Sequence, residues 1–200
     1  MAFTDGVVAI IITILVLDIK APDLASGESV RSALAEIAPT FTAFVVSFLL
    51  VGMYWVWHRG VFSNVRYVDL NAVWLSVVFL LPLSLVPFAA STLGEYPRDA
   101  SALHVYGTVL VVITIFRVFL DQYLNRHPHL LWDPPNKRTR QLSTLAAAAP
   151  MVVYAVAILV AGWSPIVSLV LYSAVPLLYF LFILFLRDDP STRDDAQHLS

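Results

Sequence analysis

The sequence predicts an all-α integral membrane protein, and two observations carry this prediction. Of the 200 residues, 59% are hydrophobic and only 13% are charged, whereas soluble domains average about 45–50% and about 25%. The apolar residues also gather in long runs that approach the roughly 20 residues a helix needs to cross a bilayer. A soluble globular domain is therefore excluded, and a net charge of −2 offers no basic surface for a nucleic acid.

Six such runs predict six transmembrane helices within one domain that spans residues 1–187. Each run holds few charges and ends at a polar, proline or glycine stretch. The expected spans cover residues 2–19, 37–57, 70–93, 103–120, 142–161 and 165–186. The polar residues 188–200 are expected to form a solvated cytoplasmic tail.

The first two spans have distinct beginnings and ends. We do not expect the first to be a cleavable signal peptide, because it lacks a positively charged leader and Asp5 interrupts its start. The second tolerates Pro39 in its first turn. Tyr54, Trp55 and Trp57 close the second span, as expected for aromatic residues that favour the membrane interface.

The remaining spans carry features that shape their packing. Proline interrupts the third span at two positions and the sixth at one, namely Pro82, Pro87 and Pro176. In the fourth, Arg117 and Asp121 lie four residues apart, which favours an ion pair on one helix face. Only residues 162–164 separate the fifth span from the sixth, so these two helices should form a tight antiparallel hairpin.

The distribution of lysine and arginine predicts the orientation. With six spans, both termini share one side of the membrane with the second and fourth loops. That side holds nine basic residues: Arg59, Arg66, Arg117, Arg126, Lys137, Arg138, Arg140, Arg187 and Arg193. The other side holds three: Lys20, Arg31 and Arg98. Because cytoplasmic loops carry the excess of basic residues, both termini are expected in the cytoplasm.

The sequence gives little support for an enzymatic function. There is no cysteine, so thiol nucleophiles and zinc–thiolate sites are excluded. There is also no serine nucleophile elbow, zinc-protease motif or phosphate-binding glycine loop. His127 and His129 flank a proline, but no carboxylate stands at a metal-ligand spacing within a helix. We expect neither an enzyme nor a bound cofactor or metal.

One face of the first span stands out. At 100° per residue, Gly6, Ile10, Thr13, Ile14 and Leu17 share this face. Thr13 is the only polar residue in the middle of the span. One interpretation is a lipid-facing or packed helix in which the Thr13 hydroxyl bonds back to a carbonyl of its own helix, four residues earlier.

The same segment resembles a known family. The run from Phe3 to Ile10 reads Phe-Thr-Asp-Gly-Val-Val-Ala-Ile and continues through Thr13 to Ile19. This run is similar to the first-helix signature of the transmembrane protein 175 family, the endo-lysosomal potassium channel of animals and its prokaryotic relatives. Thr4 stands where the signature has serine, and the signature's arginine would lie ahead of Met1.

Two further segments support the resemblance. Trp55 and His58 match a Trp-x-x-His element that ends the family's second helix. The third span and its exit, between residues 68 and 96, also look like the family, whereas the second half of the chain matches mainly in its number of spans.

The resemblance implies a potassium-permeable channel in the plasma membrane of a prokaryote. Prokaryotic members are six-span subunits that form homotetramers, with the first helix lining a central pore. Ile10 would then form the narrowest apolar ring, with Ile14 and Leu17 further along the pore. Thr13 would form a hydroxyl ring that gives a modest preference for potassium over sodium. The expected partners are three further copies of the chain, the lipid bilayer and potassium as the permeant ion.

Polar residues at both ends of the first span take supporting roles under this implication. Thr4, Asp5 and His58 would form a polar network that fixes the first helix against the second at the cytoplasmic end. Asp18 would sit at the outer mouth and disfavour anions, or pair instead with Lys20.

Two other classes of function remain open on the sequence alone. A secondary transporter would use broken helices and a polar site at mid-membrane depth, and a structural membrane protein would transport nothing. The number of copies in the assembly discriminates between these classes, because a fourfold complex favours the channel.

Overall fold

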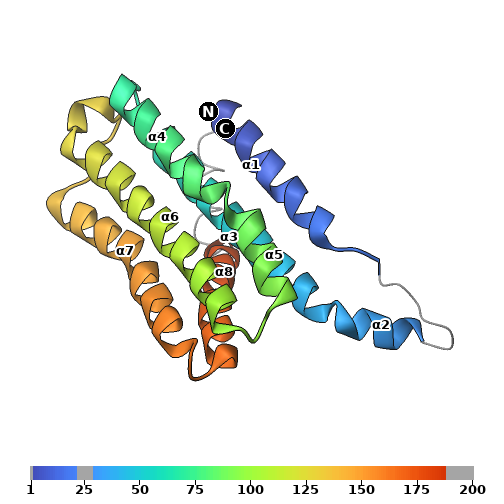
Figure 1. Cartoon of the computed structure of the whole chain (residues 1–200). Helices are drawn as coiled ribbons and strands as arrows, with labels where there is room; N and C mark the ends of the chain where they lie inside the picture. The colour runs from blue at the N-terminus through green and yellow to red at the C-terminus, as the bar shows by residue number, and fades with distance from the viewer. Residues whose placement is uncertain (1, 22–28, 188–200) are drawn as a thin grey trace.

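The computed structural model is a bundle of α-helices and describes residues 2–21 and 29–187 (Figure 1). Within this part of the chain, the only β pairing is an isolated bridge between Val65 and Leu131. The expected tail at residues 188–200 lies outside the described residues. The protein is therefore all-α, as the sequence predicts.

The first helix, α1, spans Ala2–Leu15, and a single 3-10 turn, η1, continues it over Val16–Asp18. It packs against α3, α4 and α5. The buried side chains of α1 follow a helical spacing of four, three and four residues: Thr4, Val8, Ile11 and Leu15. One stripe of α1 thus joins the core.

One helix occupies the second predicted span, and a shorter helix precedes it. A short helix, α2 (Val30–Glu36), was not expected, and it begins where the Ser29 side chain accepts a hydrogen bond from the backbone N–H of Ser32 at 3.2 Å. The long helix α3 (Ala38–Ser63) follows it and runs six residues beyond the predicted end. Val61 and Phe62 explain the extension, because they pack against a second apolar cluster beyond the main core.

The third predicted span is divided into α4 (Leu70–Leu83) and α5 (Val86–Glu95). Asp69 caps α4 by accepting from the N–H of Ala72 at 2.9 Å. Pro87 accounts for the division, because it cannot donate a backbone hydrogen bond and its ring would clash with the carbonyl of Leu83 in a continuous helix.

The second half of the chain contributes α6 (Ala100–Arg126), the 3-10 turn η2 (Pro128–Leu130), α7 (Lys137–Val160) and α8 (Pro165–Arg187). Asp99 caps α6 by accepting from the N–H of Ser101 at 2.7 Å, and Asn136 caps α7 by accepting from the N–H of Thr139 at 2.9 Å. The helices α7 and α8 pack together, so the short connection between them makes the expected hairpin.

Helices occupy all six of the predicted apolar ranges, but among the described residues four segments are long and apolar enough by themselves to cross a membrane. These segments are Ala38–Ser63, Leu70–Glu95, Ala100–Arg126 and Lys137–Val160. The apolar part of α8 over Pro165–Leu181 is shorter, and α1 has 14 residues. The structure therefore shows a helical membrane protein, and the count of six crossings stays a prediction.

The core is built around α3 and α6, and tyrosines supply much of its volume. The hydroxyls of Tyr54 and Thr114 share a hydrogen bond of 2.9 Å, and those of Tyr106 and Ser47 share one of 3.0 Å. All four of these residues are fully buried, and each of these hydroxyls has a partner within the core. The hydroxyls of Tyr154 and Ser168 are also buried but have no hydrogen-bond partner among the described residues.

The helix directions give the bundle two chemically different ends. The starts of α1, α4 and α7 and the ends of α3 and α6 lie toward the same end of the bundle, in the upper half of Figure 1. We call this the basic end, because these segments carry Arg59, Arg66, Arg126, Lys137, Arg138 and Arg140. Arg31 and Arg98 lie on segments at the opposite end.

Candidate functional site

The first helix turns one apolar face away from its own subunit. Ile10, Ile14 and Leu17 are 59%, 43% and 71% exposed, and Gly6 and Thr13 are exposed beside them. These five residues form what we call the outer face of α1. It lies opposite the stripe that joins the core, so the described part of this chain leaves it uncovered.

The Thr13 hydroxyl lies on this face and bonds to its own helix. Its oxygen is 3.0 Å from the carbonyl oxygen of Ala9 and 2.9 Å from that of Ile10. A hydroxyl has one proton to donate and two lone pairs to offer. With the proton directed to the backbone, the lone pairs of Thr13 remain on the exposed side. Back-bonding and an oxygen available to a cation are therefore compatible at this position.

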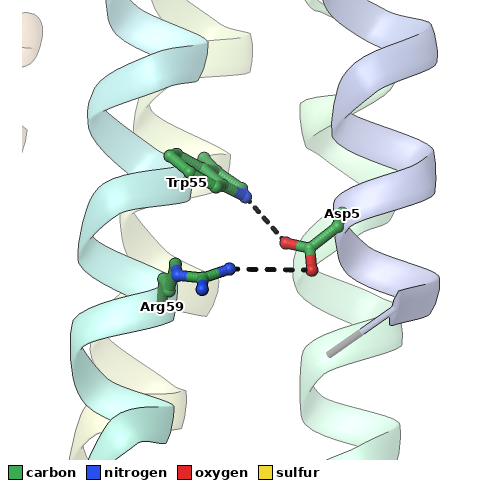
Figure 2. A network of polar contacts seen from close by, with 3 residues as sticks. All are labelled: Asp5, Trp55 and Arg59. Atoms are coloured by element: carbon green, nitrogen blue, oxygen red, sulfur yellow. Dashed lines mark hydrogen bonds and ion pairs between the residues drawn. The ribbon is translucent and has the colours of Figure 1, made fainter.

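Asp5 joins α1 to α3 near the basic end (Figure 2). The indole N–H of Trp55 donates to the Asp5 carboxylate at 2.8 Å, and the guanidinium of Arg59 lies 4.0 Å from its other oxygen. The Arg59 guanidinium also lies 5.6 Å from the centre of the Trp55 ring. We call these three residues the Asp5 cluster. Since Trp55 and Arg59 are one helical turn apart on α3, a single carboxylate can reach both.

The cluster differs in membership from the polar network that the sequence suggested. His58 is buried, and its Nε2 contacts the Ser76 hydroxyl at 3.4 Å. Its ring stacks on Phe62 and Phe79, with centroid distances of 4.5 and 6.0 Å. His58 therefore faces α4, while Thr4 is buried on α1. The helix spacing explains the difference, because position 58 lies about 80° around the helix from the middle of the face that carries positions 55 and 59, on the side that turns toward α4.

The expected ion pair between Arg117 and Asp121 does not form among the described residues. The Arg117 guanidinium lies 4.9 Å from the centre of the Trp57 ring, and its Nε is buried without a hydrogen-bond partner in the described structure. Asp121 is also buried, at 9% exposure. The π face of an indole attracts a guanidinium in apolar surroundings. Trp57 on α3 therefore holds the Arg117 side chain of α6 against α3.

At the basic end, a polar cluster joins the start of α4 to the end of α6. The Tyr123 hydroxyl donates to the Asp69 carboxylate, and this bond, together with the one from Ala72, lowers the pKa of Asp69. His127 contacts the Tyr123 carbonyl at 2.8 Å. Within residues 2–21 and 29–187, no group of three or more potential metal ligands gathers.

At the opposite end, Asp18 closes the 3-10 turn η1 and is exposed. In the described part of the chain it forms no ion pair with Lys20. A cavity of about 800 Å³ lies at this end between α3, α8 and the loop before α6, with Ala43, Leu93 and Tyr106 in its wall. No residue of α1 lines this cavity, so it is separate from the outer face of α1.

Comparisons with known proteins agree on one family. Residues 1–87 match the family described as endosomal/lysosomal potassium channel TMEM175. A potassium channel of Streptomyces collinus is 40% identical over 137 residues, which cover 66% of each chain. A potassium channel of a Chryseobacterium species is 36% identical over 125 residues, which cover 62% of this chain and 63% of that one. The match thus spans just under two thirds of the length of these curated relatives.

A solved structure extends the likeness over the whole bundle. The crystal structure of a lysosomal potassium-selective channel TMEM175 homologue from Chamaesiphon minutus superposes with a TM-score of 0.78 at 28% sequence identity. The superposition covers 90% of this chain and 94% of that chain, so it includes the second half that the family match leaves out.

Proposed function

Since the chain belongs to the TMEM175 family of potassium channels, we propose that it forms a potassium-permeable cation channel whose pore is lined by α1. The observation that carries this proposal is the outer face of α1. A polar hydroxyl stands there among exposed isoleucine and leucine side chains, on a helix that buries its other face in the subunit.

The pore requires several copies of the chain, because the outer face of α1 lies on the outside of a single subunit. We propose a homotetramer in which four α1 helices meet at the axis. Closed rotational symmetry would bring four identical faces together and cover their apolar side chains. Each ring along the axis then contains four copies of one residue.

The order of residues on the face assigns their roles in the proposed pore. Rings of Ile10, Ile14 and Leu17 form an apolar constriction, and such a constriction closes a pore by excluding water. Thr13 supplies four oxygens at one level beside Ile10, and this single layer supports a modest preference for potassium over sodium. Asp18 forms a ring of carboxylates at the outer mouth, where it disfavours anions.

The proposed orientation follows from the two ends of the bundle. The basic end would face the cytoplasm, since cytoplasmic loops carry the excess of lysine and arginine. With α1 and α8 counted, the subunit would cross the plasma membrane of a prokaryote six times and place both termini inside.

A secondary transporter is the second candidate, and one observation favours it. Arg117 and Asp121 are charged residues within a membrane-spanning helix, and such residues often mark a transport pathway. Both lie in the second half of α6, toward the basic end, whereas a transporter site is expected near mid-membrane depth. We therefore prefer the channel.

The channel proposal is tested with the purified full-length protein in liposomes. A potassium gradient should produce a flux that protein-free liposomes lack, and sodium should substitute with lower permeability. Mass measurement of the detergent-solubilised assembly should give four subunits. A tetramer that carries no potassium, or a dimer that exchanges substrates by counterflow, would contradict the proposal.

The Asp5 cluster should anchor α1 without setting ion preference. Asp5→Ala removes the acceptor of Trp55 and the partner of Arg59, so we expect the assembly to lose about 1 kcal/mol of stability per subunit. The yield of tetramer on size exclusion and its thermal unfolding measure this loss. The potassium-to-sodium permeability ratio should not change, because Thr13 is untouched.

Two matched variants sharpen the test of this cluster. Trp55→Phe keeps an aromatic ring for Arg59 but removes the indole donor, so it should reproduce most of the destabilisation. Asp18→Ala removes an exposed carboxylate at the other end of the same helix and should leave unfolding unchanged. If Asp5→Ala and Asp18→Ala unfolded alike, the cluster would have no anchoring role.

A further inference from the structure

A second cavity at the basic end has the lining of an anion site. It measures about 610 Å³ and lies between the end of α6 and the beginning of α7. Gln122, Asn125 and Arg126 line it from α6, and Arg140 and Thr144 line it from α7. Nearly every lining side chain thus carries a hydrogen-bond donor, and none of the described lining residues is acidic.

The local structure adds further positive charge. The first turn of α7 contains Lys137 and Arg138 and no acidic residue, and a helix N-terminus carries a partial positive charge. The guanidinium of Arg140 donates to the backbone carbonyl of Asn125, which holds α6 and α7 together at the cavity wall. Arg126 is exposed at the rim and makes no ion pair within the described residues.

A phosphate group is the anion that this lining fits. Arginine binds phosphate oxygens through paired N–H donors, and amide and hydroxyl groups add weaker donors around it. The arginines come from two different helices, so one phosphate between Arg126 and Arg140 would contact both walls of the cavity.

The surface next to the cavity identifies the rest of the ligand. Leu145 lines the cavity and is 67% exposed. Exposed apolar residues continue from it along one face of α7: Val152, Val156 and Leu159. The apolar stretch of α7 that is long enough to cross a membrane is only 17% buried in the subunit. This face is therefore available to the acyl chains of lipids. A ligand that combines a phosphate with an apolar chain would therefore fit both parts.

We propose that the cavity between α6 and α7 binds the headgroup of an anionic phospholipid, with its phosphate between Arg126 and Arg140 and an acyl chain along α7. The site would couple the junction of these helices to the charge of the adjacent leaflet, where basic residues attract anionic lipids. It is separate from α1, so it does not depend on the pore assignment.

The test measures phospholipid binding to the detergent-solubilised assembly by native mass spectrometry. Phosphatidylglycerol is titrated against phosphatidylcholine, which has the same diester phosphate but no net charge. The unaltered protein should bind phosphatidylglycerol more tightly, and Arg126→Gln should reduce that affinity about fivefold. Arg126 is chosen because its side chain makes no ion pair among the described residues that the substitution would break.

The matched control is Arg138→Gln. It removes the same charge from the same end of the molecule, but Arg138 does not line the cavity. This variant should leave the affinity for phosphatidylglycerol unchanged. An equal loss in Arg126→Gln and Arg138→Gln would show attraction to a diffuse basic surface and would overturn the proposed site.

The source of the phosphate is tested with sn-glycerol 3-phosphate, which carries a phosphate without acyl chains. It should compete poorly with the lipid, and Leu145→Gln should weaken phosphatidylglycerol binding several fold through loss of apolar contact. Effective competition by sn-glycerol 3-phosphate, with no effect of Leu145→Gln, would assign the cavity to a soluble phosphate ester and overturn the lipid assignment.

Discussion

Replacing Ile10 by asparagine should raise basal cation conductance about tenfold or more in the assembled channel. An apolar ring excludes water, and an ion that crosses it must lose hydration with no replacement ligand. Four asparagine amides at that level would hold water and offer carbonyl oxygens. Removal of only about 1.4 kcal/mol from the barrier gives a tenfold increase in rate.

Single-channel or liposome flux measurements check this expectation, and two variants control it. Ile14→Asn lies one turn further along the outer face of α1 and should also raise conductance. Val170→Asn places the same amide on an exposed apolar face of α8, away from α1, and should leave conductance unchanged. Unaltered flux in a correctly assembled Ile10→Asn tetramer would remove Ile10 from the constriction.

The face that motivates this experiment could be predicted from the sequence because it depends on one helix alone. The period of 3.6 residues places Ile10, Thr13 and Leu17 together whatever lies around them. The location of the helices was predictable for a similar reason, since long apolar runs in a membrane protein have few alternatives to the helix. The division between α4 and α5 could be predicted only in part, because Pro82 and Pro87 indicate the region of the break but not the residue at which α4 ends.

Contacts between helices were less predictable because they depend on how each helix is rotated. The residues of α3 are themselves hydrophobic on nearly every side of the helix, so its sequence does not indicate which face meets α1. The sequence therefore suggested His58 as the partner of Asp5, although Trp55 and Arg59 hold that place. Their spacing of four residues was the available signal. Arg117 shows the same limit, since the proximity of Trp57 arises from a helix distant in sequence.

Replacing Thr13 by valine should move the potassium-to-sodium permeability ratio toward one while conduction is retained. Thr13 offers the only side-chain oxygen on the outer face of α1, and four of them would stand at one level of a tetramer. Such oxygens replace part of the hydration shell that an ion loses in the narrow pore. Valine keeps the shape of threonine and deletes the hydroxyl, so the pore diameter should change little.

The reversal potential under mixed potassium and sodium measures this ratio, and Thr13→Ser is the matched control. Serine keeps the hydroxyl and can still direct its proton to the carbonyl of Ala9 or Ile10, which leaves its lone pairs toward the axis. Thr13→Ser should therefore preserve the preference that Thr13→Val and Thr13→Ala lose. If the hydroxyl serves only its own helix, the reversal potential of Thr13→Val will equal that of the unaltered channel, and the selectivity assigned to Thr13 will be wrong.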